Sequence, residues 1–184
     1  MAYQFSVAVR NASLDAIETT IGVSPTLEIR TGQPPASCAA ADTGTVVATL
    51  PLPSDFMAAA SAGSKALAGT WQDTGADTAG RAGHFRVKQG ATCHWQGLVS
   101  DAWQASRAYA IGDQVTNGGN LYRATAAGTS ASSGGPTGTG ASITDGGVTW
   151  TFVQVGADMS LDNATINSGQ QVTINTATIN AGGA

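Results

Sequence analysis

The sequence predicts a mainly all-β fold: a β-sandwich or jelly-roll-like domain with one or two short helices, plus a small inserted β-module. Short runs such as "HFRVKQ" (His84–Gln89) alternate apolar and polar residues, which is the period of a half-buried strand. Turn signals rich in Gly and Pro, such as "TGQPP" after Arg30, separate these runs. With 184 residues the chain is long enough to bury a substantial core, as one large domain or two small ones.

The N-terminal region changes its apolar period once. Tyr3–Arg10 alternates apolar and polar residues and is expected to be a strand. Asn11–Gly22 instead spaces its large apolar residues three and four apart, which favours a short amphipathic helix. Asn11 or Ser13 can cap the start of this helix, and Gly22 can end it.

Further elements follow from the same periods. Strands are expected at Pro25–Gly32 and Gly44–Pro53, and a hairpin with a "QG" turn at Ala82–Val99. Ser54–Leu67 opens with a capping residue and is rich in Ala, which favours one or two helical turns. The triplet Thr-Ile-Asn occurs three times between residues 165 and 180, and its uneven spacing indicates β-hairpins and not a solenoid.

The character of the chain changes between residues 101 and 155, where tryptophans and tyrosines gather beside a Gly/Ser/Thr tract. We predict one β-sandwich attachment domain made of residues 1–100 and 156–184, interrupted by an inserted β-module at 101–155. Insertions of this kind enter exposed turns whose two ends lie close together. The strand that ends at Val99 would resume after Gly156.

The inserted segment carries a recognisable aromatic pattern. "WQASRAYAIGDQVTNGGNLYRAT" holds a Trp, then Tyr-x-x-Gly-Asp-x-Val, a turn and a strand with Tyr-x-Ala, and "TDGGVTWTFV" closes the segment. This pattern resembles small chitin- and cellulose-binding modules appended to chitinases, and closely similar segments recur in phage virion proteins. The resemblance covers roughly fifty residues. It implies a carbohydrate-binding-module-like β-fold, with candidate glycan-binding residues Trp103, Tyr109, Tyr122 and Trp150.

Two interpretations of these four aromatic residues stay open. An exposed ring offers a flat apolar face to a pyranose, while polar neighbours take the hydroxyl groups. In a β-module of about fifty residues, however, aromatic residues commonly form the core. Chitin-binding members of the family add a Trp pair after the second strand, where this chain has "AAGTSASSGG" and no aromatic residue. The tract "GGPTGTGAS" is expected to be a flexible surface loop. Asp113 is expected to cap a turn.

The flanking parts are similar to a family of small proteins encoded among tailed-phage structural genes, on "MAYQFSVAVRNASLDAIETTIG" and "LDNATINSGQQVTINTATI" among other stretches. This resemblance implies a virion component assembled in the host cytoplasm. The expected role is a capsid decoration or cement protein that docks on the major capsid protein or another virion protein and forms a homo-oligomer. The alternatives are a tail or receptor-binding component, and an adhesion module for a host or environmental glycan.

Composition and motifs argue against several other classes. Only 11% of the residues are charged, against roughly 25% in ordinary soluble domains, and the net charge is −4, so no nucleic-acid partner is expected. No apolar run reaches the roughly 20 residues of a membrane span, and no signal peptide is expected. We expect no enzyme activity and no cofactor, because no motif supports catalysis. We expect no metal, because the spacing of His84, Cys93 and His94 fits no zinc site. Cys38 and Cys93 are expected to be free thiols, although a bridge between them stays open.

Overall fold

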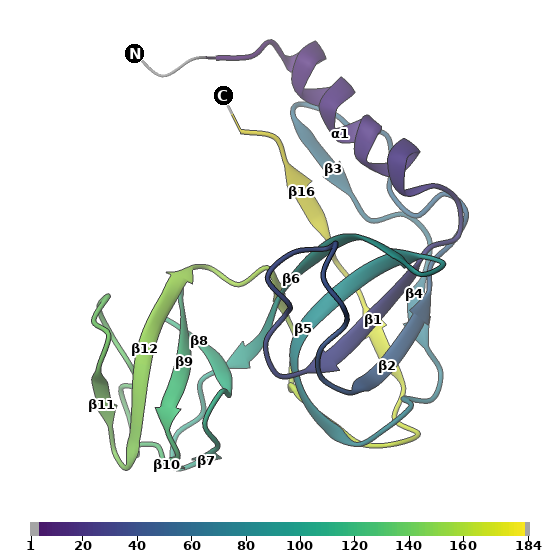
Figure 1. Cartoon of the computed structure of the whole chain (residues 1–184). Coiled ribbons are helices and arrows are strands. Elements are labelled where there is room, and N and C mark those ends of the chain that lie inside the picture. Colours follow the sequence, from purple (N-terminus) through teal and green to yellow (C-terminus); the bar gives the residue numbers. More distant parts are fainter. Residues whose placement is uncertain (1–3, 183–184) are drawn as a thin grey trace.

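The computed structural model describes residues 4–182 and confirms the mainly β fold class, with 44% of the chain in strands and 8% in helix (Figure 1). The elements, in chain order, are α1 (Val7–Ile21), β1 (Thr26–Thr31), β2 (Val46–Pro51), β3 (Ser64–Ala66), β4 (Trp71–Asp73), β5 (Gly80–Gln89), β6 (Thr92–Ala102), β7 (Ala108–Tyr109), β8 (Gln114–Asn117), β9 (Asn120–Ala126), β10 (Gly128–Thr129), β11 (Ile143–Asp145), β12 (Val148–Val155), β13 (Met159–Ser160), β14 (Thr165–Ile166), β15 (Val172–Ile174) and β16 (Thr178–Asn180).

One large mixed sheet runs through the molecule. Its strand order is β11-β12-β9-β8-β6-β5-β1-β2, with β13 also paired to β6 and β14 to β5. Strand β6 joins the two halves: its first part is antiparallel to β5, while Asp101 and Ala102 at its end pair in parallel with Val115 and Thr116 of β8. The pairs β10-β7, β15-β4 and β16-β3 form three small two-stranded sheets.

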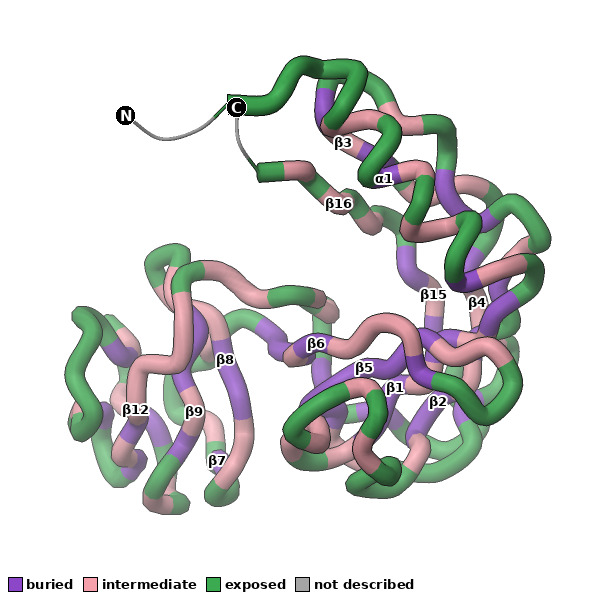
Figure 2. Tube along the Cα trace, turned by 45° about the horizontal axis from the view of Figure 1, so that its top comes forward, coloured by how far each residue is buried: buried purple, intermediate pink, exposed green. Residues whose placement is uncertain are grey.

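Two hydrophobic clusters lie on either side of this shared strand (Figure 2). The larger cluster packs Phe56, Trp71 and Phe85 among aliphatic residues from most of the chain outside 101–155. The smaller cluster draws every member from residues 103–152 and centres on Trp150. The division into two domains stays a prediction, but each side of the sheet has its own apolar cluster.

The N-terminal segment forms a helix where a strand was predicted, so the interpretation of Tyr3–Arg10 as a strand is wrong. Helix α1 begins at Val7, and the Oγ of Ser6 accepts a hydrogen bond of 3.3 Å from the backbone N–H of Val9. The cap therefore lies upstream of the expected Asn11 or Ser13. Residues 4–6 are assigned to neither helix nor strand, and Tyr3 lies outside the described residues. Gly22 ends the helix as predicted, at φ +89°.

Ser54–Leu67 contains no helix, which corrects the second helical prediction. Phe56 and Met57 are buried in the larger cluster, and Met57 pairs with Leu67 as an isolated bridge. Ala62 and Gly63 turn the chain with positive φ values of 53° and 80°. Ala-rich composition favours a helix only weakly, so burial of the two large side chains overrides it.

The three Thr-Ile-Asn triplets do not form hairpins with one another, contrary to the expectation. Residues 165–167 overlap β14, which pairs with β5; residues 173–175 overlap β15, which pairs with β4; residues 178–180 are β16, which pairs with β3. The C-terminal segment instead adds one short strand after another to earlier parts of the chain.

The strands predicted at Pro25–Gly32 and Gly44–Pro53, and the hairpin at Ala82–Val99, are confirmed as β1, β2 and β5-β6. In the hairpin Phe85 lies opposite Gly97. A Cβ at Gly97 would lie only 2.7 Å from a ring carbon of Phe85, so this strand position requires glycine. Within residues 4–182 no helix is long and apolar enough to span a bilayer.

Candidate functional site

The four aromatic residues proposed for glycan binding come together in the smaller cluster. Tyr109, Tyr122 and Trp150 are 3%, 1% and 0% exposed, and Trp103 is half-buried against them. The Tyr109 and Trp150 rings meet edge to face with their centroids 5.0 Å apart. Three of the four rings therefore have no open face for a sugar, and the core interpretation is the one that describes them.

Asp145 fixes the two indole rings, although the sequence analysis included it only within the closing stretch "TDGGVTWTFV". Its Oδ2 accepts hydrogen bonds from the Nε1 of Trp103 at 2.7 Å and the Nε1 of Trp150 at 3.1 Å. Its Oδ1 accepts a third bond of 3.0 Å from the backbone N–H of Ala131. Asp145 is 4% exposed, so these donors satisfy a buried carboxylate.

The Gly/Ser/Thr tract was expected to be a flexible loop. In the structure it is instead hydrogen-bonded to residues beside the aromatic cluster. The hydroxyl of Tyr122 donates to the Gly138 carbonyl at 2.9 Å. The side-chain amide of Asn117 donates to the carbonyls of Gly134 and Pro136 at 2.9 and 3.0 Å. Side chains of β8 and β9 thus hold a stretch whose own residues are too small to form a core.

A cluster of charged residues lies where the two halves of the sheet meet. We call Arg81, Asp101, Arg107 and Asp113 the junction cluster. Asp101, 1% exposed, receives the Nη2 of Arg81 on Oδ1 at 2.6 Å and the Nη1 of Arg107 on Oδ2 at 3.0 Å. Asp101 also accepts the backbone N–H of Ala164 at 3.1 Å. One buried carboxylate therefore joins β5, β6, the segment after β6 and the C-terminal segment.

The rest of the junction cluster reaches into the inserted segment. The Nε of Arg81 lies 3.2 Å from Asp113, which also caps its predicted turn by accepting the Ala110 N–H at 2.9 Å. The guanidinium carbons of Arg81 and Arg107 lie 5.6 and 5.5 Å from the centroid of the Tyr109 ring. Burial raises the pKa of Tyr109, which keeps its hydroxyl neutral beside these cations.

Further contacts connect the two halves of the sheet near the junction cluster. The side-chain amide of Gln114 donates to the carbonyl of Gly83 at 2.6 Å. Met159 and Ser160 pair in parallel with Val99 and Ser100, so the chain leaves the inserted segment beside the point where it enters. Two cations and two anions balance in the junction cluster, and their geometry can hold the inserted module in one orientation on the body.

A second feature is the arm, which we define as α1 with β3 and β16. Figure 1 shows the arm above strands β1, β2, β5 and β6, on the side of the molecule where the two ends of the chain lie. Ile21 of α1 belongs to the larger cluster, and Ile179 of β16 packs against it. The side chains of all three charged residues of α1 point toward β3 or toward the residue just before it. Asp15 and Glu18 bind the Nζ of Lys65 at 2.8 and 2.9 Å, and the guanidinium of Arg10 lies against Gly63.

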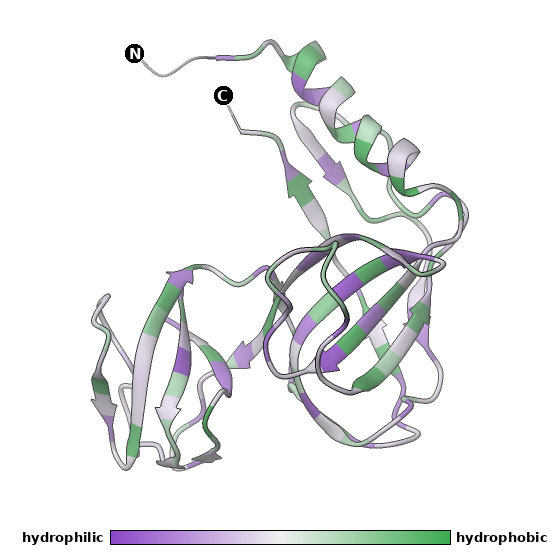
Figure 3. Ribbon diagram, viewed as in Figure 1, coloured by the Kyte–Doolittle hydropathy of each residue, from purple (hydrophilic) through white to green (hydrophobic). Residues whose placement is uncertain are grey.

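The opposite side of α1 has no charged residue. At 100° per residue, one half of the helix carries only uncharged exposed side chains, which we call the outer face of α1: Val9, Ala12, Ser13, Ala16 and Thr20. Figure 3 shows the apolar residues along this helix. Surface helices ordinarily place charged residues toward water and apolar residues inward. Helix α1 does bury Leu14 and Ile21, but its charged residues also point inward, so its outer face carries no charge. A hollow of about 300 Å³ separates this face from His94.

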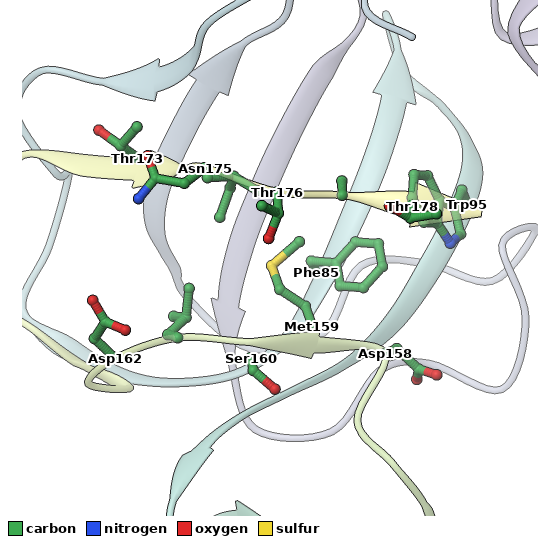
Figure 4. Close-up of a pocket in the computed structure, with 13 residues that line it drawn as sticks. Phe85, Trp95, Asp158, Met159, Ser160, Asp162, Thr173, Asn175, Thr176 and Thr178 are labelled. Carbon is green, nitrogen blue, oxygen red and sulfur yellow. The ribbon is translucent and has the colours of Figure 1, made fainter. Parts of the chain in front are cut away.

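A cavity of about 290 Å³ lies where the C-terminal segment crosses the sheet (Figure 4). Its two carboxylates, Asp158 and Asp162, lie at opposite ends of the β13 segment and do not form a pair. Asp158 already accepts the Leu98 N–H at 2.8 Å. Among the described residues no cluster of three or more His, Cys, Asp or Glu side chains could hold a metal ion.

The sequence analysis found the aromatic residues but missed the junction cluster and the uncharged outer face of α1. Both depend on partners far away in the chain, such as Arg81 with Asp113 and Asp15 with Lys65. The clearest available signal was the placement of three charged residues on one half of an otherwise uncharged helix.

Comparison with protein-family models, with curated proteins and with solved structures finds no match to this chain.

Proposed function

We propose that this protein is a virion structural protein, a capsid decoration or cement protein that docks on the major capsid protein and displays its inserted β-module outward. The uncharged outer face of α1 carries the proposal. A helix that spends its charged side chains on internal contacts and leaves an uncharged, small-residue face to solvent is suited to burial against a partner. The resemblance of the flanking segments to small tailed-phage proteins supplies the class of partner.

The internal contacts of α1 support a docking role over a loosely attached helix. Glu18 accepts the backbone N–H groups of Phe56 and Met57, each at 3.1 Å. Asn11 accepts the N–H of Gly63 at 2.8 Å. These bonds hold the helix in place before any partner arrives, so docking costs little ordering entropy.

The geometry of the joint supports display of the module. The arm and the inserted module extend from the body in different directions (Figure 1). A particle surface that covers the arm leaves residues 101–155 outside. The junction cluster holds that module at a set orientation, which a displayed element on a regular particle requires.

The test is binding to particles assembled without this protein. Purified full-length protein is mixed with such particles and sedimented, together with Ala12→Glu and Ala16→Glu, which put a charge at the centre of the outer face. Glutamate forms helices well, so the fold is retained. The matched control is Ile111→Glu, which adds the same charge at a residue 70% exposed on the module.

We expect wild type and Ile111→Glu to sediment with particles in many copies, and the two helix variants to lose binding at least tenfold. Absence of the protein from purified particles would refute the proposal. Presence in only a handful of copies would instead assign it to the tail or to a receptor-binding part. The same preparation shows by its sedimentation coefficient whether the free protein is the expected homo-oligomer.

A glycan-binding adhesion role is the second candidate, and one observation favours it. Trp103, the half-buried aromatic residue of the four, lines a cavity of about 380 Å³ with Asn117 and Gly156. Retention of the protein on chitin, cellulose or host polysaccharide, abolished by Trp103→Ala, would support this role. Equal retention of wild type and Trp103→Ala, or none of either, would oppose it.

A further inference from the structure

The loop that joins β1 to β2 brings Cys38 to the start of β6, where Cys93 lies. Cys38 is half-buried in a turn closed by the Ala40 N–H on the Ser37 carbonyl at 3.1 Å. Cys93 is 8% exposed, pairs with Lys88 across the β5-β6 hairpin, and donates through its Sγ to the Trp95 carbonyl at 3.5 Å. Both thiols are free in this structure.

A buried arginine holds the loop at this position. Arg86 is 1% exposed, and its Nη2 donates to the Cys38 carbonyl at 2.7 Å. Its Nη1 lies 2.6 Å from Asp42, whose other oxygen binds Lys88 at 2.7 Å. The loop is therefore tied to the hairpin that carries Cys93 at two points, the Cys38 carbonyl and the Asp42 carboxylate.

The two thiols share one local environment. Cys38, Cys93 and Arg86 line a single hollow of about 610 Å³. Burial raises the pKa of the Cys38 thiol to about 11, and the adjacent Cys93 thiol contributes to that rise. A thiol of this kind is mainly protonated at neutral pH, unlike the acidic thiols of redox catalysts.

We propose that Cys38 and Cys93 are an oxidation site: a small-molecule disulfide converts them to an intramolecular disulfide that locks the β1–β2 loop onto the β5-β6 hairpin. The thiolate of Cys38, the more exposed of the two, attacks one sulfur of the small disulfide and releases one thiol. The thiolate of Cys93 then attacks the Cys38 sulfur of the mixed disulfide and releases the second thiol. The protein loses two protons and two electrons, and the small disulfide is reduced to two thiols.

This inference does not depend on the proposed function. The bridge would constrain the unfolded chain over the whole span from Cys38 to Cys93 and add to the hold of Arg86 on the loop. The reduced protein made in a reducing compartment would thus gain stability on reaching an oxidising one. We expect the melting temperature to rise by about 5 °C or more on oxidation and to return on addition of a reductant.

The experiment treats the full-length native protein with glutathione disulfide and then counts free thiols by alkylation and mass spectrometry. We expect both thiols to be lost together, with no glutathione retained and a peptide linking Cys38 to Cys93. Cys38→Ser and Cys93→Ser, each with one remaining thiol, should show no such rise in melting temperature. Two thiols that stay reactive, or two separate glutathione adducts, would overturn the proposal, and the wild-type measurement needs neither variant to fold.

Discussion

Arg81 and Asp101 face each other across the neighbouring strands β5 and β6 and form a two-pronged ion pair, with Nη2–Oδ1 and Nη1–Oδ2 distances of 2.6 and 3.2 Å. Arg107 approaches the same carboxylate from the inserted segment. Asp101 is almost fully buried, and the two guanidinium groups and the Ala164 N–H compensate its charge. This pair links β5, which packs in the larger cluster, to the start of the predicted inserted segment, residues 101–155.

Asp101→Asn is expected to destabilise the protein strongly. The amide cannot accept two charged donors as the carboxylate does, so Arg107 loses its counter-charge and Arg81 keeps only its pair with Asp113. Breaking one side of a buried pair costs about 3–5 kcal/mol. Urea denaturation should show a clearly lower midpoint, while Asp162→Asn at an exposed carboxylate should leave it unchanged. Equal midpoints for the two variants would contradict the role of Asp101.

Trp150→Ala is expected to unfold the inserted module. The indole is fully buried, packs on Tyr109 and donates to Asp145, so its removal leaves a cavity and takes away one of the three hydrogen bonds that the buried carboxylate accepts. Such a truncation costs about 3–5 kcal/mol. Amide hydrogen exchange should accelerate over residues 101–155 and remain slow in β1 and β2. Unchanged exchange in the module would mean that its core lies elsewhere.

Lys65→Met is expected to loosen the arm. Lys65 is 3% exposed, and although burial alone would lower its pKa, Asp15 and Glu18 outweigh that effect and raise it. The variant removes the cation that holds both carboxylates, at a cost of about 2 kcal/mol. Tryptic cleavage after Arg10 should become faster. Thr20→Ala on the outer face is the control and should be cleaved at the wild-type rate.

Stability is expected to fall as the pH drops below about 6.5, because of His84. Burial lowers the pKa of this imidazole below its unfolded value, and nearby Arg30 and Arg86 lower it further against the opposing Gly32 carbonyl and Asp42. The folded state therefore binds a proton less readily than the unfolded state, so the contribution is complete at higher pH and is lost on acidification. The slope from one proton is at most about 1.4 kcal/mol per pH unit.

Thermal melts between pH 5 and pH 8 test this prediction, compared between wild type and His84→Gln. The variant should show a weaker dependence on pH, because its side chain does not titrate. Identical slopes for wild type and His84→Gln would show that another group controls the acid limb.

Local patterns predicted the parts of this fold that depend on residues close in sequence. The β5-β6 hairpin follows from alternation on both sides of Gly90, and the end of α1 follows from Gly22. The start of α1 was missed because Phe5, Val7 and Val9 also have the alternation of a strand. Alternation alone does not distinguish the two structures, since a strand also needs a neighbouring strand to pair with. Ser54–Leu67 was missed because Ala-rich composition is a weak determinant beside the burial of Phe56.

By itself the sequence determined the mainly β class, the strands β1, β2, β5 and β6, and the aromatic residues of the inserted segment, since each rests on a period or a turn within a few residues. Only the tertiary structure decided whether those rings face inward, which charges meet at Asp101, and that α1 turns its charges toward Lys65. These outcomes depend on contacts between residues tens of positions apart, and the free energy of burial that selects them is a property of the assembled core and not of any local stretch.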